Sequence, residues 1–91
     1  MKNTCFKPSQ RAVVLIEKGF ATLFNARNAH LVALNDVACF IWRAIESKKC
    51  VNDIIDLMVS EYDVDKQTAE IAVSEQLNYL LKAGFIESGN M

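Results

Sequence analysis

The hydrophobic period of the sequence changes at Leu34-Asn35-Asp36-Val37-Ala38-Cys39-Phe40-Ile41-Trp42. Before this stretch, short runs of β-branched and aromatic residues alternate with turn residues, a pattern typical of strands. From Asn35 onward, apolar residues recur every three or four positions, which is the period of a helix that buries one face. The stretch therefore marks the boundary between a sheet and a group of helices.

The first part of the chain predicts three antiparallel strands. They cover Val13-Val14-Leu15-Ile16, residues 20–24 and residues 30–34. Glu17-Lys18-Gly19 and Asn25-Ala26-Arg27-Asn28 are rich in turn-forming residues and should join them by two tight turns. Residues 7–9, Lys-Pro-Ser, lack any period and should form an extended lead-in.

The second part predicts three helices. Asn35 or Asp36 can cap the first, which should end at Ser47-Lys48-Lys49. Asn52 can cap the second, which should stop near Glu61. Asp65 can cap the third, which should run to Gly84, a residue suited to a left-handed helix end. Residues 85–86 should then fold back as a short apolar tail. The predicted fold is α+β and resembles a winged helix-turn-helix whose three-stranded sheet precedes its three helices.

Length and composition describe one domain, residues 1–91, with a core over residues 12–86. The chain has 91 residues, of which 52% are hydrophobic and 23% charged, so it can bury enough apolar surface to fold. Its longest apolar run, residues 37–42, is far shorter than the roughly 20 residues of a membrane span. No secretory signal is evident, which favours a cytoplasmic location. Cys5, Cys39 and Cys50 form no paired motif, so reduced thiols are expected.

Charge and motifs exclude several functions. Residues 1–34 carry a net charge of +4 and residues 35–91 one of −5, so the sheet is basic and the helical part acidic. Carboxylates on the third helix would oppose binding to a phosphate backbone, which disfavours a DNA-reading role. No nucleotide-binding, hydrolase or zinc-protease motif is present, so we expect neither an enzyme nor a cofactor. With His30 as the only histidine, a metal site is not expected either.

Residues 34–42 resemble the opening of the first helix in the PqqD-like family, small leader-peptide-binding chaperones also called RiPP recognition elements. The family pairs Leu-Asn with an Ile/Val-Trp pair about a turn and a half later. Residues 51–55 are similar to its second-helix opening, and residues 77–86 to its closing pattern of leucines, glycine and an apolar pair. The sequence lacks the longer signature of members dedicated to pyrroloquinoline quinone synthesis. This points to another peptide-modification pathway.

The resemblance implies that a precursor leader peptide adds as a strand to the edge of the sheet, against the last helix. The partner would then be a radical, cyclising or ATP-dependent modifying enzyme, with no nucleic acid or membrane involved. Strand addition is physically reasonable because an exposed edge offers unpaired N–H and C=O groups. The implied peptide-binding residues are those of the third strand and one face of the third helix: His30, Leu31, Val32, Ala33, Leu34, Ala69, Ala72, Val73 and Gln76.

Several alternatives stay open. Adjacent strand residues point to opposite faces, so the sequence does not say which alternate set along residues 30–34 meets the peptide. A proline at Val32 would delete a donor to the peptide only if that N–H faces outward. The chain could also be a winged-helix DNA-binding regulator or a structural subunit of a larger enzyme. A monomer is the default, although an exposed edge permits dimers.

Overall fold

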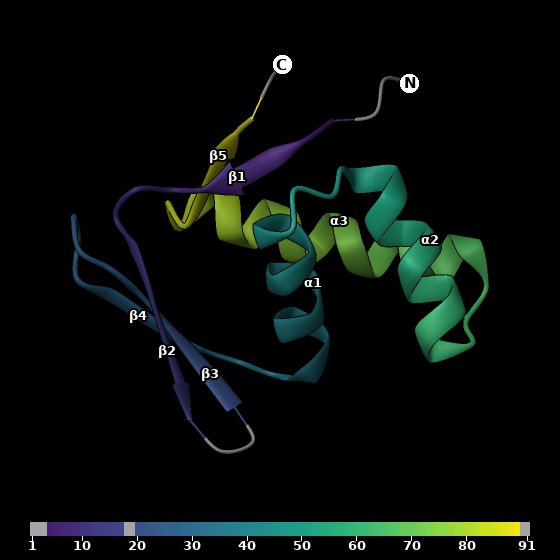
Figure 1. The fold of residues 1–91 in the computed structure, drawn as a ribbon, viewed down its shortest axis with the longest axis horizontal. Coiled ribbons are helices and arrows are strands. Elements are labelled where there is room, and N and C mark those ends of the chain that lie inside the picture. The colour runs from purple at the N-terminus through teal and green to yellow at the C-terminus, as the bar shows by residue number, and fades with distance from the viewer. Residues whose placement is uncertain (1–3, 18–19, 90–91) are drawn as a thin grey trace.

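The computed structural model describes residues 4–17 and 20–89. The elements are β1 (Phe6–Pro8), β2 (Ala12–Glu17), β3 (Phe20–Asn25), β4 (His30–Leu34), α1 (Asp36–Glu46), α2 (Val51–Tyr62), α3 (Lys66–Lys82) and β5 (Ile86–Ser88). Figure 1 shows the three-stranded sheet on one side and the helices on the other. The predicted α+β class is confirmed. No helix within the described ranges is both long and apolar enough to cross a membrane.

The three-stranded antiparallel sheet has the order β2-β3-β4, as predicted. Val14 pairs with Leu23, and Leu23 pairs with Val32. Leu23 is fully buried, so this row lies on the inner face. The next row, Val13, Phe24 and Leu31, lies on the outer face, where Val13 and Leu31 are exposed. The strands therefore alternate between core and surface. Residues 18–19 of the predicted first turn lie outside the described residues.

A second sheet joins the two ends of the chain, which the sequence did not predict. β1 and β5 pair antiparallel, with Phe6 opposite Ser88 and Pro8 opposite Ile86. The expected lead-in and apolar tail are therefore partners in a two-stranded sheet. Three-residue strands are too short to show a period of two, and their pairing depends on a contact between distant segments.

The helices begin and end close to the predicted residues. Asn35 caps α1 through its side chain, which accepts from the N–H of Ala38 at 2.8 Å. Asp65 caps α3 in the same way, accepting from the N–H of Thr68 at 2.7 Å. Hydrogen bonds from the Thr68 side chain and backbone lower the pKa of Asp65 below its ordinary value. The prediction of Asn52 as the cap of α2 is wrong, because the helix begins at Val51 and Cys50 is its N-cap residue.

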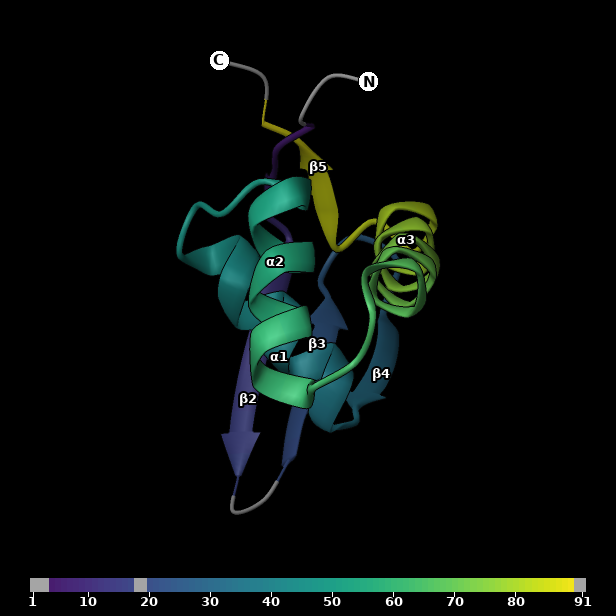
Figure 2. The ribbon, with the colours of Figure 1, turned by 90° about the vertical axis from the view of Figure 1, so that its right-hand side faces the viewer.

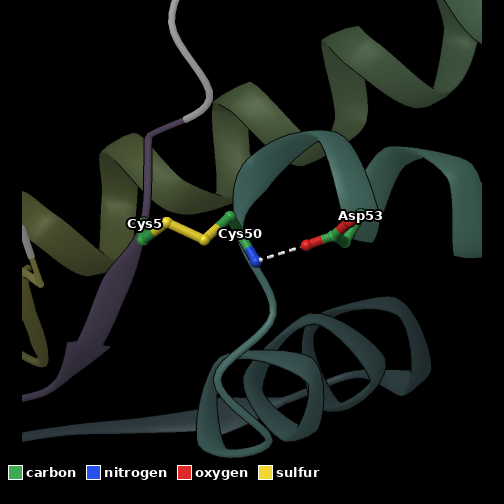
Figure 3. The surroundings of a disulfide bond; sticks show 3 residues. All are labelled: Cys5, Cys50 and Asp53. Carbon is green, nitrogen blue, oxygen red and sulfur yellow. Dashed lines mark hydrogen bonds between the residues drawn. A yellow bond between two sulfur atoms is a disulfide. The ribbon is translucent and has the colours of Figure 1, made fainter. Parts of the chain in front are cut away.

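Cys5 and Cys50 form a disulfide, so the expectation of three reduced thiols is wrong for these two residues (Figure 3). The backbone already brings them together, because Val51 N–H donates to Thr4 O at 2.8 Å and the two cysteines form an isolated antiparallel bridge. Asp53 accepts from the backbone N–H of Cys50 at 3.1 Å and completes the first turn of α2. Cys39 is free, and its thiol lies 3.9 Å from Leu34 O.

The core lies between the inner face of the sheet and the three helices. Leu34, Ile41 and Trp42, which carry the family motif, are all buried. They belong to the one core cluster that the sheet and the helices share, and so they act as packing residues. The other large, fully buried side chains come from every layer: Leu23, Ile45, Ile54, Val73, Leu80 and Phe85.

Asn25 and Gly84 fasten the sheet to the end of α3. The Asn25 amide nitrogen donates to Ala83 O and Gly84 O at 3.0 and 3.1 Å, and its oxygen accepts from Arg27 N–H at 2.9 Å. Asn25 is only 3% exposed. Gly84 has φ +81°, and a Cβ there would lie 2.6 Å from the Asn25 amide nitrogen. Glycine is therefore required both for the left-handed turn and for this approach.

Replacing Gly84 by alanine should lower the free energy of unfolding by about 2 kcal/mol, from the positive φ and the displaced Asn25 amide. Chemical denaturation of the variant and of wild type measures the difference. Gly89→Ala is the comparison variant, because a Cβ there meets the Phe6 backbone closely, at 3.3 Å, but without the 2.6 Å overlap of position 84, so a smaller loss is expected. Equal stability of Gly84→Ala and wild type would contradict this account of the Asn25 contact.

Candidate functional site

β2 and β4 are the two outer strands of the three-stranded sheet, and β4 is the one that contacts α3, through His30 and Tyr79. Within the described part of the chain, β4 pairs with β3 on one side and with no strand on the other. Figure 2 shows β4 as the edge strand that lies below α3. An unpaired edge offers backbone donors and acceptors to any extended peptide of suitable sequence.

The register identifies which backbone groups of β4 face outward. Ala26 N–H, just after β3, donates to Arg11 O on the β2 side at 2.8 Å. Alternate residues of a central strand bond to opposite neighbours, so Leu23 and Asn25 bond toward β4. Their partners are Val32 and His30. The N–H and C=O groups of Leu31 and Ala33 therefore point to the open edge, while those of Val32 point to β3. A proline at Val32 would consequently remove a bond within the sheet.

The side chains of β4 divide between the two faces. Val32 is half-buried and Leu34 fully buried on the inner face, whereas Leu31 and Ala33 are exposed on the outer face. Leu34 thus belongs to the core. Among the five β4 residues, Val32 is the apolar side chain that a peptide lying along the edge could still contact from the inner side.

The predicted face of α3 is partly core. Ala69 and Val73 are both fully buried, so neither offers surface to a peptide. Ala72 and Gln76 are half-buried. Positions 72, 76 and 79 share one face of a helix by their i, i+4, i+7 spacing, so the stripe continues to Tyr79. We define the α3 stripe as Ala72, Gln76 and Tyr79.

Tyr79 was missed by sequence reasoning, and its side chain contacts β4. His30 Nε2 lies 3.2 Å from Tyr79 Oη, and the His30 ring packs against Phe85 with centroids 5.8 Å apart. From this contact α3 and β4 diverge toward Leu34 (Figure 1). The signal that could have found Tyr79 is its place three residues after Gln76 on the same helix face.

The groups at this site are suited to binding an extended chain. Among the described residues, no group of three or more His, Cys, Asp or Glu side chains is arranged to hold a metal ion. The polar groups that face outward at β4 are backbone amides and carbonyls, beside small and apolar side chains. Such an arrangement recognises an extended chain through its main chain and selects it through alternate side chains.

An open sheet edge beside a helix is an arrangement suited to binding an extended peptide, and the comparisons point to a family of small domains. Residues 21–86 match the family described as coenzyme PQQ synthesis protein D (PqqD). The chain belongs to the PqqD family. Comparison with curated proteins gives no match.

Two solved structures share the fold. One is described as TbiB1 in complex with the TbiA(beta) leader peptide; it is 26% identical, with a TM-score of 0.85 over 93% of this chain and 98% of that chain. The other is described as lasso peptide synthetase B1 complexed with the leader peptide. It is 22% identical, with a TM-score of 0.83 over 90% of this chain and 96% of that chain, which demonstrates a common fold. Neither is described as a DNA-binding protein.

Proposed function

We propose that this protein binds the leader of a ribosomally synthesised precursor peptide as a fourth strand along β4. The observation that carries the proposal is the open edge of β4, at which Leu31 and Ala33 each direct an N–H and a C=O outward. A guest strand would satisfy these groups and extend the antiparallel sheet. Membership of the PqqD family supports this function, as does the likeness to two proteins described as leader-peptide complexes.

Selectivity would come from alternate side chains of the guest. Those that point inward would meet half-buried Val32 and the α3 stripe. Ala72 is small and leaves room for a bulky apolar guest residue, while Gln76 can bond to a polar one. The inner contact residues in this proposal are therefore Val32, Ala72, Gln76 and Tyr79. Leu34, Ala69 and Val73 support them from within the core.

The protein would act without catalysing a reaction itself. A leader held by its backbone leaves the following segment of the precursor free for a radical, cyclising or ATP-dependent enzyme. Presentation of this kind needs affinity and orientation, for which the β4 edge supplies main-chain bonds. We place this step in the cytoplasm, where ribosomal precursors are made.

We expect micromolar or tighter binding to the synthetic leader of a short precursor encoded beside the gene. Titration of isotope-labelled protein should shift the amide signals of β4 and α3, above all those of Leu31 and Ala33, because their N–H groups gain partners. NMR spectra recorded at increasing leader concentration measure this. The amides of α2 form the internal control, because this helix does not border β4. Shifts concentrated on α2, or no shifts at all, would refute the proposed site.

A further inference from the structure

A basic pocket lies at the His30 end of β4, between the β3–β4 turn and the end of α3. It has a volume of about 370 Å³ and is lined by Ser9, Arg11, Asn25, Arg27, Asn28, Lys82, Ala83 and Gly84. Three lining residues are cationic and none is acidic. Arg11 lies in the turn between β1 and β2, Arg27 lies in the turn between β3 and β4, and Lys82 is the last residue of α3, in the acidic helical part of the chain. The fold thus concentrates positive charge where the sequence alone placed it in separate segments.

The three cations have no anionic partner among the described residues. Where side chains are described, the ion pair that forms joins Lys7 to Glu87, and Arg11, Arg27 and Lys82 are exposed and unpaired. One cation beside the last turn of α3 would complement the negative end of the helix dipole. Three cations exceed that need, and the carbonyls of Ala83 and Gly84 already accept from Asn25. The pocket therefore has uncompensated positive charge.

The pocket is also rigidly built. Buried Asn25 holds both the helix end and the backbone of Arg27. Asn28 accepts from His30 N–H at 2.9 Å, which fixes the turn to the first residue of β4. A strand advances roughly 3.4 Å per residue, so a guest residue two or three positions past His30 lies beyond the strand end, beside this turn. The backbone of the turn that carries Arg27 and the helix end that follows Lys82 are therefore held together, which reduces the ordering needed when an anion binds.

Building on the proposed function, we propose that this pocket binds an Asp or Glu side chain of the guest peptide. The carboxylate would accept hydrogen bonds from Arg27 and Lys82, with Arg11 adding to the positive field. A guest antiparallel to β4 has its C-terminal end at His30. The acidic residue should therefore follow the paired segment by a few positions. This acid would fix the register of the guest, which main-chain pairing alone leaves free to slip.

The test is selection of peptides from a random display library against the intact protein. Wild type should enrich peptides in which an alternating apolar segment is followed by Asp or Glu. The double variant Arg27→Gln/Lys82→Gln should enrich the same apolar segment without the acid. The matched control, Lys49→Gln/Lys66→Gln, removes equal charge at exposed positions away from the pocket and should select as wild type does.

A synthetic peptide from the wild-type selection allows the acid to be tested directly. Replacing the Asp or Glu of this peptide by Asn or Gln should weaken its binding to wild type about tenfold, as expected for loss of a charge-assisted hydrogen bond. The same change in the peptide should have little effect on its affinity for Arg27→Gln/Lys82→Gln. In that variant the cations that would bind the acid are already gone, so removing the acid has no further contact to break. Selected peptides without an acid, or additive losses, would overturn the pocket proposal. Selected peptides that bind Ala33→Pro as well as wild type would instead overturn the proposed function.

Discussion

Replacing Ala33 by proline should weaken leader binding by at least about a hundredfold and leave the protein folded. The register directs the Ala33 N–H away from β3, so its removal breaks no bond of the ladder, and proline is tolerated on an edge strand in this orientation. A guest carbonyl opposite position 33 would then lose its donor and meet the proline ring. The residue before it, Val32, is already extended, as a residue preceding proline must be.

Isothermal titration of the synthetic leader into each protein measures this effect. Ala33→Ser is the matched control, because it keeps the N–H and its side chain lies on the exposed outer face. Val32→Pro should behave differently, since it removes a bond between β4 and β3 and so lowers the free energy of unfolding. Unchanged affinity in a folded Ala33→Pro protein would demonstrate that the guest does not use this edge.

Opening the Cys5–Cys50 disulfide should lower the free energy of unfolding by about 4 kcal/mol, the chain-entropy value for a closed loop of this length. The two cysteines are 45 residues apart, and the bond ties β1 to the start of α2 (Figure 3). Without it, the β1–β5 sheet is held by its own short ladder and by the packing of Phe6. The unfolded chain gains the conformational freedom that the cross-link removed.

Urea denaturation with and without a thiol reductant measures this loss. The variant Cys5→Ser/Cys50→Ser should have the same free energy of unfolding as the reduced wild type, and the reductant should not change it. Serine also suits the N-cap position of α2 at residue 50, so the helix start is preserved. Cys39→Ala is the control, because it leaves the disulfide intact and should keep the full response to reductant. Equal midpoints for wild type with and without reductant would contradict a stabilising role.

Local patterns were sufficient for the three-stranded sheet and the three helices. Asn35, Asp65 and Gly84 lie where a side-chain cap or a left-handed turn is needed, and such signals act within a few residues. The β1–β5 sheet and the disulfide were not predictable, since they join segments that only the finished fold brings together. Phe6 pairs with Ser88, but the hydrophobic pattern of neither three-residue segment predicts that it forms a strand.

The candidate site was predictable in outline but not in its side chains. The order of the strands leaves two edges, β2 and β4, and it was the resemblance to the PqqD-like family that selected β4. Burial of Ala69 and Val73 depends on how α3 rotates against the core, and i, i+4 spacing cannot distinguish neighbouring stripes of one helix. The contact of His30 with Tyr79 spans 49 residues and is a product of tertiary packing.

Pairing of β1 with β5 has a consequence for how the domain can be joined to other polypeptides. Gly89 N–H donates to Cys5 O at 2.9 Å, so the chain enters and leaves the described fold at one place. Figures 1 and 2 both show this place above the helices, pointing away from β4. A fused enzyme or an affinity tag joined through these strands would therefore start from the β1–β5 sheet and not from β4, whose outer edge would stay accessible.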